Sequence, residues 1–126
     1  MIDTDVLIWF FRGNESAEVF LRKIPYGQRV TSSLCIMELV QGCLDRHELK
    51  TVKDFAKNNL SSVMHPDDKT CEKAMILLER HSLSDGLRTI DALLAATAIT
   101  KGVTLATSNL KHFKNISGLH LQPFAP

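Results

Sequence analysis

Three acidic residues lie far apart in the chain, and each sits beside an apolar segment. They are Asp3 in MIDTDVLIWFF, Glu38 in SSLCIMELVQG and Asp91 in RTIDALLAATAI. A carboxylate that leaves water loses several kcal/mol of hydration, so a buried one needs a cation, a hydrogen-bond donor or a proton. Three acids gathered by folding repel one another unless a divalent cation holds them. Any one of them alone fits a helix cap, but the three together indicate a site for Mg²⁺ or Mn²⁺.

The size and composition of the chain fit one globular domain. A chain of 126 residues is long enough for a genuine core and leaves little room for a second domain, so we expect a single domain over residues 1–126. Apolar residues make up 44% of the chain and charged residues 23%, which argues against extensive disorder. The formal net charge is +1, so any nucleic-acid site must come from local patterning.

Cysteine spacing and the N-terminal residues indicate the compartment. Cys35, Cys43 and Cys71 form no CxxC pair and are odd in number, which favours reduced thiols over a disulfide framework or a zinc site. Asp3 and Asp5 stand where a signal peptide needs basic residues, and no apolar run approaches the length of about 20 residues that a membrane span requires. These features predict a cytoplasmic protein with no membrane partner.

Short β-type runs alternate with helical patterns along the whole chain. Residues 1–3 are expected to form the end of a very short strand. Further strands are expected over 29–31, 62–64, 103–106 and 120–122. Helices are expected from Thr4 or Asp5, over 16–23, from Ser32 or Ser33 to Gly42, over 47–58, from Asp67 or Asp68 to the Asp85–Gly86 turn, from Thr89 to Gly102, and over 111–113. This alternation predicts an α/β fold with a central, mainly parallel sheet flanked by helices.

The predicted topology brings the three acids towards one edge of that sheet. Ligands of parallel sheets bind beyond the carboxyl ends of the strands, and Asp3 and residues 107–109 both follow strands there. Glu38 and Asp91 follow on later helices. Asp91 falls in the first turn of its helix, where the helix dipole stabilises negative charge.

Four segments together carry a family resemblance: MIDTDVLIWFF, MELVQG, GLRTIDALLAATAITKG and LATSNLKHFKNISGL. In this order and spacing, the chain resembles the PIN-domain ribonucleases, and specifically the VapC-type toxins of bacterial type II toxin–antitoxin systems. The resemblance covers nearly the whole chain. It implies a single PIN-like domain that acts as a metal-dependent endoribonuclease and hydrolyses phosphodiester bonds in RNA, with tRNA or another translation RNA as a plausible substrate.

The resemblance also assigns roles and partners. It implies that Asp3, Glu38 and Asp91 are catalytic ligands of Mg²⁺ or Mn²⁺ and that Asn109 occupies a fourth catalytic position. Many family members carry Asp there, so Asn109 leaves the second metal position with one negative charge fewer. Asp5 stands where relatives often carry Asn, and we expect it to cap a helix. A cognate VapB-like antitoxin that covers the acidic pocket and a homodimer are further implications.

Several residues near these motifs keep two interpretations open. Thr107 and Ser108 can orient a carboxylate or a water, or they can simply form a turn. Arg88 can contact phosphate or remain solvated. Trp9 and Phe10 can serve the antitoxin groove or pack in the core.

The sequence suggests two alternatives to the ribonuclease function. The DTD sequence near a strand end resembles the opening of haloacid-dehalogenase-type phosphatases, but that chemistry needs a downstream Lys and an acidic pair in a larger scaffold. The stronger alternative is a non-catalytic PIN-like module that binds RNA or protein, disabled by the missing acid at Asn109. The presence of Asp3, Glu38 and Asp91 argues against that alternative.

Overall fold

The computed structural model describes all residues 1–126, and its centre is a parallel sheet joined by a single residue. β1 (Val30–Ser32) pairs with β2 (Ser62–Met64), and β3 (Leu105–Thr107) pairs with β4 (Leu121–Pro123), both in parallel. Ile2 forms parallel bridges to Thr31 and to Ala106, so it lies between the two pairs. The order across the sheet is therefore β2, β1, Ile2, β3, β4, and the predicted α/β fold with a parallel sheet is confirmed.

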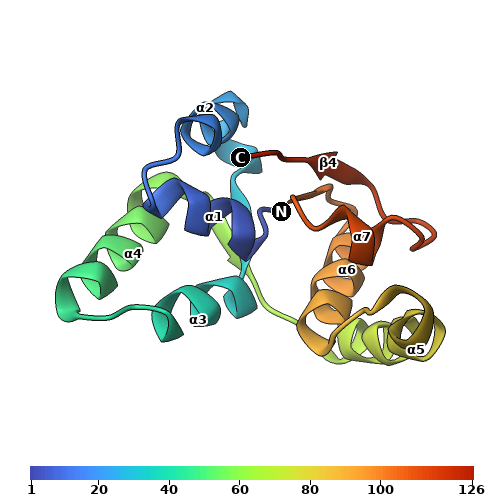
Figure 1. Cartoon of the computed structure of the whole chain (residues 1–126). Helices are drawn as coiled ribbons and strands as arrows, with labels where there is room; N and C mark the ends of the chain where they lie inside the picture. The colour runs from blue at the N-terminus through green and yellow to red at the C-terminus, as the bar shows by residue number, and fades with distance from the viewer.

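Helices connect the strands and form two groups, one on each side of the N-terminal residues (Figure 1). The first group comprises α1 (Thr4–Phe11), α2 (Glu15–Lys23), α3 (Ser33–Gln41) and α4 (Arg46–Asn59), with a 3-10 turn, η1 (Tyr26–Gln28), after α2. The second comprises α5 (Asp68–Asp85), α6 (Thr89–Lys101) and the short α7 (Leu110–Phe113). None of these helices combines the length and the apolarity that crossing a membrane would need.

Each helix group buries its own set of apolar side chains against the sheet. The α1–α4 core consists of Ile2, Val6, Leu7, Ala17, Leu21, Ile24, Leu39, Val52, Leu60 and Phe124. The α5–α7 core consists of Met1, Val30, Cys35, Ala74, Leu77, Leu87, Ala92, Leu94, Ala95, Ala96, Ala98, Leu105, Phe113 and Ile116. Met1 and Ile2 belong to different cores because successive side chains of an extended chain point to opposite faces.

Small residues let α6 lie close to its neighbours. Ala92, Ala95, Ala96 and Ala98 are buried almost completely, as the alanine-rich sequence predicts. An alanine side chain keeps its neighbours near the helix axis, so the α6 backbone approaches both the sheet and α5. This packing fixes the N-terminal end of α6, where Asp91 lies.

One predicted strand begins two residues later than expected. Residues 103–106 were predicted as a strand, but β3 starts at Leu105. The reason is that Gly102 takes a left-handed conformation at the end of α6, with φ +66°, and the Val103 N–H donates to the Ala98 carbonyl. This closes the last turn of the helix, and the sheet pairing resumes where the Leu105 N–H donates to the His120 carbonyl.

Two leucines of α5 test the assignment of its buried face. Leu77 is 2% exposed, whereas Leu83 on the same helix is fully exposed. We predict that Leu77→Ala lowers the free energy of unfolding by about 2–5 kcal/mol because it leaves a cavity in the α5–α7 core. Leu83→Ala is the matched control and is expected to stay within about 0.5 kcal/mol of wild type. Urea denaturation measures both values, and equal losses would contradict the assigned face.

Candidate functional site

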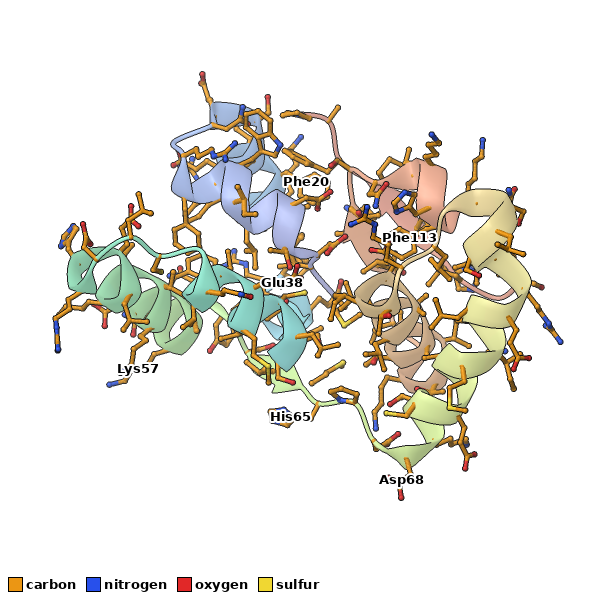
Figure 2. All side chains as sticks on the ribbon, turned by 60° about the horizontal axis from the view of Figure 1, so that its bottom comes forward. Phe20, Glu38, Lys57, His65, Asp68 and Phe113 are labelled. Carbon is orange, nitrogen blue, oxygen red and sulfur yellow. The ribbon has the colours of Figure 1, made fainter.

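A polar cleft of about 480 Å³ opens where the central strands end. All four residues predicted for the site line it, together with Asp5 and Arg88. The remaining lining residues are Thr4, Ile8, Thr89, Ile90 and Leu94, and the predicted site residues are Asp3, Glu38, Asp91 and Asn109. Figure 2 shows the labelled Glu38 near the middle of the molecule, between the two helix groups. Folding therefore brings together acids that are up to 88 positions apart, from residue 3 to residue 91.

Asp3 is the most buried of these acids, with 7% of its surface exposed. It directly follows Ile2 and caps α1, because its Oδ1 accepts from the Thr4 N–H at 2.7 Å. Its Oδ2 accepts from the Thr107 hydroxyl at 2.8 Å. The expected cap at Thr4 or Asp5 is thus wrong by one residue, since the extended backbone of Asp3 already brings its own carboxylate over the first turn.

Burial and neighbouring charge alter the acidity of Asp3. Loss of hydration raises its pKa from 3.8 to about 7, and the nearby negative charges of Asp5 and Asp91 act in the same direction. The hydrogen bonds from Thr107 and Thr4 oppose this rise without cancelling it. Asp3 therefore binds a proton near neutral pH unless another cation takes its place.

Glu38 comes from the middle of α3 and contacts the start of α1. The Thr4 hydroxyl donates to Glu38 Oε1 at 2.8 Å, so the residue after Asp3 also holds the second acid. Glu38 Oε2 makes no hydrogen bond within the protein. That oxygen is free to accept a ligand from the cleft.

Asp91 lies in the first turn of α6, as predicted, and it closes that turn. Its Oδ2 accepts from the Arg88 N–H at 3.2 Å. Arg88, and not the expected Thr89, occupies the cap position of α6, because α6 begins at Thr89 itself. Asp91 Oδ2 also lies 2.9 Å from Nδ1 of His112, while Oδ1 makes no protein hydrogen bond.

Asp5 fastens the loop after β3 to α1. Its Oδ2 accepts from the Ser108 N–H at 2.9 Å and from the Ser108 hydroxyl, and it lies 3.4 Å from the Thr107 hydroxyl. Asp3 fills the cap position of α1 itself, but Asp5 Oδ1 accepts from the Val6 N–H at 2.7 Å, so Asp5 also satisfies a free backbone donor of the first helical turn. Thr107 and Ser108 both hold acids of the cleft, which supports the first of their two interpretations.

One residue of the site was missed in the sequence. His112 contacts Asp91 and also lies with Nδ1 3.0 Å from Nδ2 of Asn109. The available signal was its position in the NLKHF segment, three residues after Asn109 and thus on the same side of a helical turn. Spacing alone did not show that this turn packs against α6.

The donors around the cleft suit a hard divalent cation. Four carboxylates and one amide face the cleft with a single basic side chain, Arg88, and oxygen ligands are those that Mg²⁺ and Mn²⁺ prefer. The side chains do not form a closed coordination shell. No three acidic, His or Cys side chains are close enough to one another to bind one ion jointly.

The aromatic residues of α1 are partly buried and pack against the α1–α4 core. Phe10 packs against Phe11 and Phe55, with ring centroids 5.4 Å and 5.0 Å apart. These contacts support the second interpretation of Trp9 and Phe10. Ile8 is the apolar residue of α1 that lines the cleft, and it is 37% exposed.

The chain has a parallel α/β sheet with acids gathered at the carboxyl ends of its strands. The protein family that it matches is consistent with this arrangement. The family described as the PIN domain matches residues 1–119, and the chain belongs to this family. Ribonuclease VapC1 of Rickettsia felis is 32% identical to it over 128 residues, covering 96% of this chain and 92% of the relative. Within the PIN domain family the chain is thus of the VapC type.

Solved structures share the fold over nearly the whole chain. A toxin–antitoxin complex from Klebsiella pneumoniae matches with a TM-score of 0.78 and 26% identity, covering 94% of this chain and 92% of that one. DNA-bound VapBC from Salmonella typhimurium matches with a TM-score of 0.79 and 22% identity, covering 99% of this chain and 97% of that one. These matches support a single PIN-like domain.

The raised pKa of Asp3 predicts a pH-dependent effect of Asp3→Asn on stability. Between pH 3.8 and about 7, folded Asp3 keeps a proton that the unfolded chain releases, so wild-type stability falls as the pH rises through this range. Asn cannot ionise, so Asp3→Asn is expected to raise the free energy of unfolding at about pH 8, on the order of 1–3 kcal/mol, and much less at about pH 4.

Urea denaturation in EDTA at both pH values measures this effect. EDTA is needed because a bound cation would itself stabilise the ionised carboxylate. Glu79→Gln, at an exposed position of α5, is the control for loss of one negative charge. An equal effect of Asp3→Asn at the two pH values would show that Asp3 does not titrate in this range.

Proposed function

We propose that this protein is a metal-dependent endoribonuclease toxin that hydrolyses phosphodiester bonds in RNA. The observation that carries the proposal is the gathering of Asp3, Glu38 and Asp91 around one cleft at the strand ends. The 32% identity to Ribonuclease VapC1 over most of both chains supports it. Single-stranded or looped RNA is the substrate class, and tRNA or another translation RNA is the candidate substrate.

Asp3, Glu38 and Asp91 would hold Mg²⁺ or Mn²⁺ through their carboxylate oxygens. Bound there, such an ion supplies Lewis-acid chemistry: it polarises the scissile phosphate and lowers the pKa of a water, the proposed nucleophile. Glu38 Oε2 and Asp91 Oδ1 are the oxygens that have no protein donor, so they are the ones available to a ligand. Both carboxylate oxygens of Asp3 already accept hydrogen bonds from the protein. Its negative charge is costly to bury without a nearby cation, as its raised pKa indicates.

Four further residues would complete the site around the three acids. Thr107 and Thr4 donate to Asp3 and Glu38 and so limit the rotation of both carboxylates. Arg88 is the basic side chain that lines the cleft, and it could contact a substrate phosphate there. Asn109 brings an amide to the fourth position, which adds a hydrogen-bonding group without another negative charge.

The proposed protein partner is a VapB-like antitoxin. A second cleft of about 500 Å³ lies among α1, α3 and α4, and it shares Ile8 and Glu38 with the acidic cleft. Val40 and Leu44 nearby in the chain are 40% and 88% exposed, so apolar surface is available for a partner. A segment bound in the second cleft would end beside Glu38, which is where a nuclease inhibitor must act.

Cleavage of total bacterial RNA by the purified, antitoxin-free protein tests the activity. We expect fragments in Mg²⁺ or Mn²⁺, none in EDTA and none with Asp3→Ala. Asp91→Asn is expected to lower the rate by about a hundredfold or more, because the loss of a charged ligand removes several kcal/mol of transition-state stabilisation. Its melting temperature should stay near or above wild type, since one repulsive charge has been removed.

The outcomes separate the two functions under consideration. Metal-dependent fragments that disappear in EDTA and with Asp3→Ala support the ribonuclease. A folded protein that yields no fragments in any metal supports the non-catalytic PIN-like module instead, and binding of RNA without cleavage would identify it. Full activity of Asp91→Asn would remove Asp91 from the metal site.

A further inference from the structure

His112 contacts two residues of the proposed site without lining the cleft itself. Its ring belongs to α7, and Nδ1 lies 2.9 Å from Asp91 Oδ2 and 3.0 Å from the Asn109 amide nitrogen. The side chains of His112 and Asp91 are 25% and 16% exposed. His112 therefore reaches the acid of α6 and the amide of the β3–α7 loop from outside the substrate space.

The contact with Asp91 determines the state of the ring. An ionised carboxylate only accepts hydrogen bonds, so Nδ1 of His112 must carry the hydrogen that it donates. A protonated Nδ1 cannot accept from the Asn109 amide nitrogen. A half-turn of the amide about its Cβ–Cγ bond would present Oδ1 to the ring, so that Asn109 could accept from the same N–H. One ring nitrogen would then orient both Asp91 and Asn109.

The rest of the structure holds the ring in place. Phe113, the next residue, is completely buried in the α5–α7 core, as its labelled position in Figure 2 also shows. Gly86 faces the other side of the ring, since a Cβ at residue 86 would lie 3.6 Å from His112 Nε2. Gly86 has a φ of +69°, a left-handed conformation that favours glycine. The imidazole therefore has little freedom to turn away from Asp91.

A comparison of the three acids shows what His112 contributes. Thr107 donates to Asp3 and Thr4 donates to Glu38, each through a side-chain hydroxyl at 2.8 Å. His112 is the only side chain that donates to Asp91. Each proposed metal ligand therefore has one side-chain donor, and His112 completes the set. Such donors orient metal ligands and fix which oxygens remain free.

We propose that His112 is a positioning residue, which holds Asp91 and Asn109 in the orientation that metal binding and RNA cleavage require. This inference rests on the proposed ribonuclease function. It assigns no direct contact between His112 and the substrate, and it treats α7 as part of the site.

Three variants separate positioning from a merely structural role. His112→Phe keeps a ring but removes the donor, and His112→Asn keeps an N–H donor at the place of Nδ1. Asn115→Ala is the matched structural control: it breaks the 2.9 Å hydrogen bond from Asn115 to Asp85, which fastens the same segment to the end of α5 but does not reach Asp91. All three are compared by RNA cleavage and by calorimetric titration with Mn²⁺.

We expect His112→Phe to lower kcat and Mn²⁺ affinity by about 10- to 100-fold, with KM for RNA changed much less. His112→Asn should recover most of both losses, and Asn115→Ala should behave as wild type in both measurements. Circular dichroism and the melting temperature establish that each variant is folded. Wild-type kcat and Mn²⁺ affinity in His112→Phe, or equal losses in Asn115→Ala, would overturn the proposal.

A spectroscopic measurement tests the geometry independently of the ribonuclease. Long-range ¹H–¹⁵N spectra of the histidine rings report which nitrogen carries the hydrogen. We expect His112 in the wild type to be protonated at Nδ1 and to lose this signature in Asp91→Ala. Should the wild type cleave no RNA, the proposed function fails, and this spectrum still decides the positioning contact. A His112 ring with an unprotonated Nδ1, or one indifferent to Asp91→Ala, would refute it.

Discussion

The backbone pairing of the first three residues is the constraint on which the site depends. The Ile2 N–H donates to the Val30 carbonyl at 2.7 Å, and the Asp3 N–H donates to the Ala106 carbonyl at 2.9 Å. The Ala106 N–H returns a bond to the Met1 carbonyl at 2.8 Å. These bonds join two otherwise separate strand pairs, and they leave Asp3 at the end of the central strand. The position of the most buried acid thus follows from sheet formation itself.

Three of the four acids of the cleft are held in place by hydroxyl side chains and not by Lys or Arg. Thr4 and Thr107 donate to Glu38 and Asp3, and Ser108 donates to Asp5. Hydroxyl groups orient carboxylates but do not neutralise them, so the cleft keeps its negative potential. Burial of Asp3, assisted by the neighbouring negative charges, raises its pKa and so opposes folding when the carboxylate is ionised. The same negative potential favours the binding of a cation. Lysine or arginine at the same positions would relieve the repulsion and remove the attraction for metal.

Topology made most of the fold and of the acidic site predictable from sequence. Alternating strand and helix patterns imply parallel strands, and parallel strands bring their carboxyl ends together, which is why Asp3, Glu38 and Asp91 could be assigned to one cleft. Local competition for backbone hydrogen bonds was harder to foresee. It moved the caps to Asp3 and Arg88 and delayed β3 to Leu105.

His112 lay beyond such reasoning for a different reason. Its partner Asp91 is 21 positions away, and their contact depends on how the four residues of α7 dock on α6 and beside Gly86. Strand and helix patterns do not specify that docking.

The acids of the cleft are carried by helices that pack in two separate cores. Asp3 starts α1, which packs in the α1–α4 core, whereas Asp91 belongs to α6 in the α5–α7 core, and the sheet between them is only a few residues deep. If these acids share a cation, as proposed above, it would act as a cross-link between two halves of the molecule. Its binding energy would then add to the cohesion of the halves, so the concentration of free metal would set how readily they separate.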